Sequence, residues 1–370
     1  MKRRQFLSGA AVAGATAAAA STFAKPAIAQ DVREWRLVTT WPKNFPGLGT
    51  GANLLAEYIT KASNGRLKVT VFGAGEIVPA FEAIDAVGSG TVEMGHGAPY
   101  YWKGKVDATQ YIAAMPFGLN AQEQNAWFQW GGGQELADKV YAELNCKFFP
   151  SGNTGTQMGG WFNKEMNTIA DYQGLKMRIP GLGGEVVKAA GANVVNLPGG
   201  EIPPALQSGA IDATEWVGPY NDLAFGLYKS AKYYYYPGWH EPSTQLELIV
   251  NKKAYDGLPE HLRVIIDKAA TAAGVALHAK GVAERTAALA EATDLLIERQ
   301  FCPPRRGETY AVLAHWGAPV LATVDRAACP VFGFNAFGVH IHGLVAQPEG
   351  TAMWIGRRGL NRGVAPGRLD

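Results

Sequence analysis

Hydrophobic and polar positions alternate or recur along most of the chain in ways that predict strands and helices in turn. Alternation over 35–40 and over 67–72 predicts two strands. Apolar residues at helical spacing between these strands, and again over 79–87, predict a helix after each one. Because strands that alternate with helices are typical of largely parallel sheets, we expect an α/β fold.

One seven-residue segment occurs twice. Residues 75–81, Gly-Glu-Ile-Val-Pro-Ala-Phe, resemble residues 200–206, Gly-Glu-Ile-Pro-Pro-Ala-Leu. A predicted strand precedes each copy, and a Ser-Gly helix stop, an acidic strand and a Pro-Tyr loop follow each in the same order. Short matches of common residues arise by chance, but this concordant order favours an internal duplication. We therefore expect two similar lobes, with a ligand cleft between them at the carboxyl ends of the strands.

The carboxyl-terminal quarter has a different character. Pro259 opens a helical pattern that predicts a long bracing helix over 258–298. The last lysine is Lys280, whereas nine of the 16 arginines lie in the final 90 residues. The segment 293–370 is therefore either a short extra module or an out-of-frame translation, and its composition favours the second interpretation. In that case we expect a loosely packed tail that proteases cut before the lobes.

The amino terminus resembles an export signal. Two adjacent arginines, Arg3 and Arg4, precede a short run of small apolar residues, and Ala27-Ile28-Ala29 predicts cleavage before Gln30. A membrane anchor is the alternative, but the run is short and weakly hydrophobic. The arginine pair matches the twin-arginine pattern, so we expect residues 1–29 to direct the mature chain to the periplasm by that route.

Composition and motifs argue against several functional classes. The formal net charge of +2 gives no field that would favour nucleic acid as a partner. Three widely spaced cysteines, Cys146, Cys302 and Cys329, predict neither a disulfide framework nor a zinc site, and we interpret Cys146 as an ordinary buried residue. The sequence contains no nucleophile elbow, zinc-protease motif or phosphate loop. We therefore predict a binding protein and not an enzyme, with a periplasmic enzyme acting on a small carboxylic acid as the alternative.

The side chains best suited to bind a ligand lie in the central segment of the chain. Alternation over 175–179 places Arg178 at the end of a strand, where its guanidinium can bind a carboxylate through two parallel hydrogen bonds. A solvated surface arginine is the alternative interpretation. Glu215 and Trp216 follow the second acidic strand and could supply a hard oxygen ligand and a flat wall, unless they are a core tryptophan with an incidental acid.

A series of spaced motifs resembles the extracytoplasmic receptors of tripartite ATP-independent periplasmic (TRAP) transporters, above all their alpha-keto acid branch. The resemblance runs from Met1 to about Ala292. It implies a two-lobed periplasmic binding protein fold, type II-like, with lobe I formed by 30–152 plus about 246–280 and lobe II by 153–245. The motifs that carry it are Arg3–Leu7, Thr40–Pro42, Gly65–Leu67, Gly155–Phe162, Gly174–Arg178, Ser208–Trp216 and Tyr234–Trp239.

The same resemblance implies the ligand and the partners. The ligand would be a 2-oxo acid such as pyruvate, held with a metal cation, sodium first and calcium second, and delivered to a membrane permease. An exchanged helix can join two subunits in this branch, so a homodimer is expected unless the tail prevents it. The residues assigned to the substrate are Arg178, Gln157, Trp216, Tyr100 and Tyr101, and those assigned to the cation are Glu215, Gln245, Gln157 and Trp216.

Overall fold

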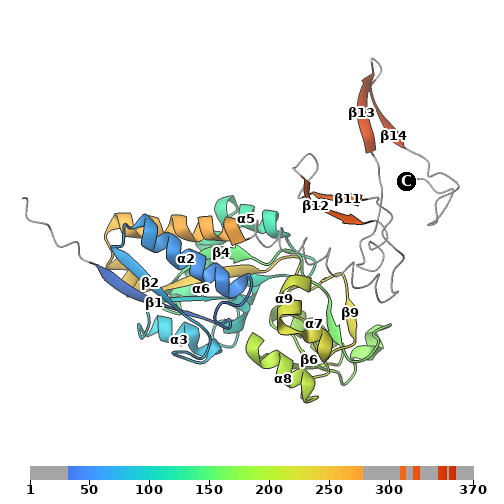
Figure 1. Cartoon of the computed structure of the whole chain (residues 1–370), viewed down its shortest axis with the longest axis horizontal. Helices are drawn as coiled ribbons and strands as arrows, with labels where there is room; N and C mark the ends of the chain where they lie inside the picture. The colour runs from blue at the N-terminus through green and yellow to red at the C-terminus, as the bar shows by residue number, and fades with distance from the viewer. Residues whose placement is uncertain (1–31, 278–308, 314–319, 326–340, 348–349, 356–370) are drawn as a thin grey trace, which may run out of the picture.

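The computed structural model describes residues 32–277 and, in the carboxyl-terminal segment, the backbone of four further strands, so the expected signal peptide lies outside the described residues. Two five-stranded sheets form the centres of two lobes (Figure 1). In spatial order, the lobe I sheet contains β2 (Leu67–Phe72), β1 (Arg33–Thr39), β3 (Met94–Gly97), β10 (Gln245–Asn251) and β4 (Cys146–Asn153). The lobe II sheet contains β7 (Asn193–Val195), β6 (Lys176–Arg178), β8 (Ala213–Thr214), β5 (Gly160–Phe162) and β9 (Tyr233–Tyr235).

The two sheets have the same pattern of strand directions. In each, three mutually parallel strands are followed by one antiparallel strand, β10 in lobe I and β5 in lobe II. The repeated segment leads into equivalent elements: η1 (Ala80–Glu82) and α3 (Ala83–Gly88) precede β3, while η4 (Gly199–Glu201) and α8 (Ile202–Gln207) precede β8. The α/β expectation with two similar lobes is confirmed.

Strand β3 begins at Met94, after the turn that follows α3. The backbone N–H of Val92 donates to the carbonyl oxygen of Ala86, 3.1 Å away, so this residue still closes the turn after α3 and is not available to the sheet. The sheet pairing then starts at Met94, which lies opposite Leu37 of β1.

Helices cover both faces of the lobe I sheet. Helix α2 (Leu48–Ala62) and a helix over 260–277 share one face, where Leu55 and Ile266 pack against strand residues of the same buried cluster. Burying such a side chain contributes about 1.5–3 kcal/mol to folding. The described part of the long helix packs on lobe I, and the part predicted to reach further lies outside the described residues. The opposite face is covered by α3 and α6 (Gly133–Ala142).

The remaining short elements fill the space around the two sheets. Lobe I also contains η2 (Pro99–Trp102), α4 (Thr109–Ala113), α5 (Ala121–Trp130) and α10 (Lys252–Asp256). Lobe II contains η3 (Ile169–Tyr172), α7 (Gly181–Ala189), α9 (Pro219–Phe225) and η5 (Leu227–Lys229). Among the described residues, no helix combines the length and apolar character needed to cross a bilayer.

Within residues 32–277 the chain passes between the two sheets twice, and the two crossing segments lie side by side. The first joins β4 to β5 and the second joins β9 to β10. The backbone N–H of Thr154 donates to the carbonyl oxygen of Thr244 at 3.0 Å, and that of Gln157 donates to the carbonyl oxygen of Glu241 at 3.1 Å. These paired segments connect the two lobes, and we call them the hinge.

The described part of the tail consists of two antiparallel hairpins. Strand β11 (Thr309–Leu313) pairs with β12 (Val320–Asp325), and β13 (Ile341–Gln347) pairs with β14 (Gly350–Ile355). Figure 1 shows both hairpins beyond the edges of the two lobes. None of these strands belongs to either five-stranded sheet.

Candidate ligand and metal site

Two neighbouring parallel strands of lobe II bring Arg178 and Glu215 together. Arg178 is the last residue of β6, and Glu215 follows directly after β8. Because Arg178 is in register with Thr214, the two side chains leave the sheet at the same edge. Both are buried, with 1% and 0% of their side chains exposed. Arg178 is therefore a buried charged group, and the solvated-arginine interpretation is wrong.

Arg178 uses most of its donors inside the protein. Its Nη1 forms an ion pair with Glu215 Oε1, its Nε donates to the carbonyl oxygen of Leu197 at 3.0 Å, and its Nη2 lies 3.5 Å from the hydroxyl of Tyr101. Its guanidinium carbon lies 5.4 Å from the ring centroid of Trp216. Burial acts to lower the pKa of Arg178, but Glu215 together with Tyr101 and Tyr100 raises it overall, so the guanidinium remains charged.

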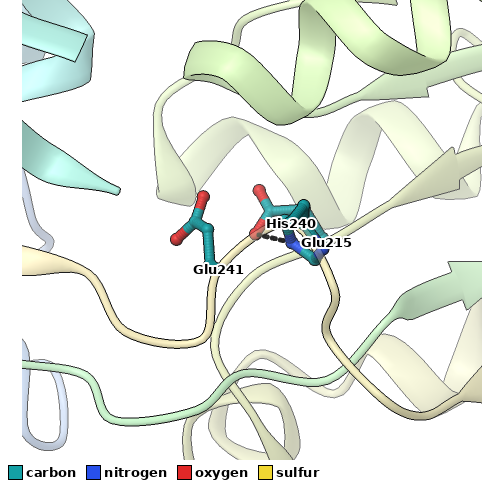
Figure 2. Close-up of side chains that lie close together, drawn as sticks. All are labelled: Glu215, His240 and Glu241. Carbon is teal, nitrogen blue, oxygen red and sulfur yellow. Dashed lines mark hydrogen bonds and ion pairs between the residues drawn. The ribbon is translucent and has the colours of Figure 1, made fainter. Parts of the chain in front are cut away.

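A second group of side chains comes from the crossing segment that returns to lobe I. His240 Nε2 lies 3.4 Å from Glu215 Oε2, and Glu241 lies beside them (Figure 2). One potential ligand atom from each of the three lies within 4.8 Å of the others. Burial, with a further contribution from the nearby Glu215, raises the pKa of Glu241 to about 8. Burial would lower the pKa of His240, but Glu215 and Glu241 raise it overall.

Gln157 lies on the other crossing segment and faces Glu241. Its Nε2 donates to Glu241 Oε2 at 2.7 Å and also lies within hydrogen-bonding distance of the hydroxyls of Thr154 and Thr244. With the amide nitrogen fixed in this way, the Gln157 amide oxygen is buried and has no partner among the described residues. A buried acceptor without a donor costs stability unless a bound group satisfies it.

Lobe I supplies the wall opposite Arg178. Tyr100 and Tyr101 lie on η2, and the ring of Tyr101 contacts that of Trp41, whose ring centroid is 6.1 Å from that of Trp216 in lobe II. Burial raises the pKa of Tyr101 to about 12, so its hydroxyl stays protonated. Gly181 has a φ of +58°, and a Cβ there would lie 3.1 Å from Cβ of Tyr100, so a glycine permits this close approach of the lobes.

A model of the bacterial extracellular solute-binding protein family 7 matches residues 37–298 of the chain. The chain belongs to this family. The finding confirms the resemblance to TRAP receptors that the sequence motifs indicated, and it assigns the protein to a class of solute-binding receptors and not of enzymes.

Relatives of this solute-binding protein extend the comparison. A monocarboxylate 2-oxoacid-binding periplasmic protein of Nostoc sp. is 49% identical over 282 residues, which cover 75% of this chain and 77% of that protein. A TRAP periplasmic solute-binding protein of Pseudoalteromonas atlantica, crystallised with sodium and pyruvate, is 43% identical with a TM-score of 0.69. One from Colwellia psychrerythraea, crystallised with calcium and pyruvate, is 44% identical with a TM-score of 0.69. Each alignment covers 73% of this chain and 80% of the solved chain.

A shorter similarity involves another kind of protein. Over 87 residues, or 24% of this chain, the sequence is 38% identical to the chloroplastic nudix hydrolase 20 of Arabidopsis thaliana. The aligned stretch covers 23% of that hydrolase, so its activity does not carry over to the solute-binding protein.

The residues proposed from sequence do not all come together in this family member. Arg178, Glu215, Trp216, Gln157 and Tyr101 belong to one continuous group of contacts. Tyr100 packs beside Tyr101. Gln245 differs, because its Nε2 donates to the carbonyl oxygens of Gly152 and Leu246, both 2.7 Å away, and not to a member of that group.

Two residues of the cluster, His240 and Glu241, were missed in the sequence. They follow Trp239, at the end of an aromatic run, and precede Pro242. An adjacent imidazole and carboxylate in a Pro- and Gly-containing loop is a weak signal, because most such pairs are exposed. Here the pair is buried only because its crossing segment packs against Gln157 and Glu215.

Proposed function

We propose that the chain is the periplasmic receptor of a TRAP transporter and binds a 2-oxo acid such as pyruvate together with a metal cation between its lobes. The observation that carries the proposal is the buried ion pair of Arg178 and Glu215, in a member of a receptor family whose relatives hold pyruvate with sodium or calcium. The enclosed site also contains a second buried carboxylate, Glu241.

Arg178 is the group that would bind the ligand carboxylate. Its charged guanidinium can form two parallel hydrogen bonds to a carboxylate, and Glu215 occupies part of that position in the present structure. The Trp216 Nε1 is buried and has no partner in the part of the chain that the structure describes, so it could donate to an oxygen of the same ligand. Ligand binding would then exchange one carboxylate partner of Arg178 for another.

The residues that could bind a cation are those whose side-chain oxygens have no partner or could give up their present partner. Glu215 and Glu241 supply carboxylate oxygens, and the unpartnered amide oxygen of Gln157 lies in the same group. Such a donor set suits sodium or calcium, and sodium remains our first assignment. A bound cation would supply the positive charge that lets Glu215 and a ligand carboxylate lie close together.

Two residues assigned to the cation from sequence fit less well. Trp216 has no side-chain acceptor, so it could contribute only its backbone carbonyl oxygen. Gln245 has an unpartnered amide oxygen, but its amide nitrogen is anchored at the start of β10. We therefore propose Glu241 in the place of Gln245. His240, whose raised pKa favours its protonated form, would balance the carboxylate charge and not act as a ligand.

Ligand entry requires separation of the two lobes. The side chains of Arg178, Glu215 and Glu241 are almost completely buried, and lobe I closes over them through Tyr101. Gln157 and Glu241 lie on the two segments that cross between the lobes, so a ligand bound there would contact the hinge as well as lobe II. We propose that the loaded, closed form is recognised by the membrane permease and that the chain reaches the periplasm by the twin-arginine route.

Titration calorimetry of the purified protein with pyruvate in sodium-containing buffer tests this function. We expect saturable binding of one pyruvate per chain, with the acid recovered unchanged. Parallel titrations with oxobutyrate and lactate rank the acids by affinity. No heat of binding for any acid of this series, or conversion of pyruvate during the incubation, would reject the proposal.

A further inference from the structure

Asp222 is a buried carboxylate that lies outside the proposed ligand cluster. It belongs to α9, its side chain is 1% exposed, and it accepts four hydrogen bonds. Its Oδ1 accepts from the backbone N–H groups of Val217 at 3.2 Å and Gly218 at 3.0 Å. Its Oδ2 accepts from Trp161 Nε1 at 2.9 Å and from the hydroxyl of Tyr234 at 2.7 Å. Nearly all the acceptor capacity of this carboxylate is therefore used.

Two of these donors belong to the loop that carries the proposed ligand residues. Strand β8 ends at Thr214, and the next four residues, 215–218, leave the sheet and connect it to α9. On the other side of this loop, the carbonyl oxygen of Val217 accepts from the backbone N–H of Met158 at 3.0 Å. The loop is thus held between Asp222 and the first crossing segment, which fixes where Glu215 and Trp216 point.

The other two donors make Asp222 a rigid anchor. The rings of Trp161 and Tyr234 stack with centroids 3.9 Å apart and an interplanar angle of 14°. Trp161 and Tyr234 lie opposite each other on β5 and β9 of the lobe II sheet. The carboxylate therefore joins the loop to the sheet itself and not to a mobile side chain.

The same helix also reaches lobe I. Asn221 Nδ2 donates to the carbonyl oxygen of Pro46 at 2.8 Å, and the ring of Phe225 lies 4.2 Å from that of Phe45. Phe225 and Phe45 both contact Trp216. A displacement of α9 would consequently change the loop and the contact between the lobes together.

We propose that Asp222 is a positioning residue of the ligand site, which sets the affinity for cation and oxo acid by holding the backbone of 217–218 and thereby placing Glu215 and Trp216. This inference rests on the proposed function, because it takes those two residues as parts of the site. A charge-assisted acceptor for two backbone N–H groups is stronger than a neutral one, so the amide of asparagine would not replace it.

The experiment compares Asp222→Asn with a matched control, Asp171→Asn. Asp171 is also a lobe II aspartate that accepts two backbone N–H groups, from Asn167 at 2.9 Å and Thr168 at 2.7 Å, but it is only half-buried and these partners lie outside the ligand cluster. Pyruvate dissociation constants are measured by calorimetry at several sodium concentrations, well below the unfolding temperature of each variant. We expect at least tenfold weaker pyruvate binding and a higher sodium midpoint for Asp222→Asn, and wild-type values for Asp171→Asn.

A purely structural role would lower the unfolding temperature of Asp222→Asn and leave both binding parameters of the folded protein unchanged, and that result would overturn the proposal. If Asp222→Asn does not fold, Tyr234→Phe tests the proposal instead. It removes one hydrogen-bond donor to Asp222 and keeps the ring that stacks on Trp161. We then expect several-fold weaker binding, and unchanged affinity would contradict the inference. Failure of the wild-type protein to bind pyruvate would refute the proposed function instead, so the two failures are distinguishable.

Discussion

Gln157 Nε2 donates a hydrogen bond of 2.7 Å to Oε2 of Glu241, across the two segments that connect the lobes. The bond fixes the Gln157 amide so that its oxygen remains buried and unpaired. Glu241 also accepts from the hydroxyl of Thr244, which leaves its other oxygen available. This arrangement places a carboxylate and an amide oxygen at the hinge, next to Glu215, and it leads to the first prediction.

Glu241→Gln should weaken cation binding more than pyruvate binding at saturating cation. The substitution keeps the size of the side chain and removes a carboxyl group that can ionise when a cation binds, and because cation affinity depends on the charge of the ligands we expect a loss of about tenfold or more. Sodium and calcium titrations followed by tryptophan fluorescence measure it. Glu201→Gln, an exposed carboxylate of lobe II, is the control. Equal cation affinities of both variants would remove Glu241 from the site.

Removal of the cation should itself weaken pyruvate binding. Without an intervening positive charge, Glu215 would repel the carboxylate that Arg178 attracts. Pyruvate titration after exhaustive chelation and exchange of sodium for a large organic cation tests this, and re-addition of sodium should restore the affinity. Full affinity in the depleted protein would contradict a role for any metal.

Arg178→Met should weaken pyruvate binding by at least about 2 kcal/mol, or roughly thirtyfold, because loss of one partner of a buried charge pair leaves the other uncompensated. Met keeps the apolar stem of the side chain and removes the guanidinium. Lys176→Met is the matched control, since Lys176 lies on the same strand and pairs with Asp212 at the surface. Binding by Arg178→Met at wild-type strength would show that another group holds the carboxylate.

His96 predicts how stability depends on acid. Its Nδ1 accepts from Trp41 Nε1 at 2.9 Å, and burial lowers its pKa from 6.5 to about 4. At pH values between these two pKa values, the unfolded chain binds a proton at His96 that the folded chain does not. The free energy of unfolding therefore rises with pH over this window, and this contribution to stability is lost as the pH falls toward 4. The contribution of His96 to the change in the free energy of unfolding is about 3 kcal/mol at most.

The measurement is denaturant unfolding from pH 4 to pH 7 for two variants. His96→Asn keeps an acceptor for Trp41 but cannot titrate, so its stability should depend less steeply on pH than that of the wild type. His261→Asn, at an exposed position, should retain the wild-type slope. An unchanged slope in His96→Asn would assign the acid sensitivity to other groups.

The tail should be dispensable for ligand binding. All the proposed ligand and cation residues lie before β10 ends, and the family match stops at residue 298. A chain ended after Glu298 should bind pyruvate as the full chain does, whereas one ended after Leu277 should be less stable, because it also loses part of the matched segment. Loss of pyruvate binding on removal of 299–370 alone would make the tail part of the receptor.

The origin of the tail is open to a direct test. Its composition favours an out-of-frame translation of 293–370 over a short extra module. Resequencing of the coding region decides the reading frame, and limited proteolysis decides whether the tail is cut before the lobes.

The sequence by itself determined the architecture and half of the site. Periodicity is a local property, so it identified strands such as β1 and β6, and the repeated segment revealed two equivalent lobes. Arg178 and Glu215 could be proposed together because each lies at the end of a strand, and parallel neighbours end at the same edge of a sheet. Family motifs then supplied the ligand class.

Only the tertiary structure decided which distant side chains complete the cluster. Glu241 is 84 residues from Gln157 and meets it because the two crossing segments pair, which no local pattern encodes. Thr244 and Gln245 are adjacent in sequence, yet the first contacts Glu241 and the second binds carbonyl oxygens of the lobe I sheet. Successive residues of an extended chain point in opposite directions, so the exact register of a strand, set by packing, determines which of them faces the ligand.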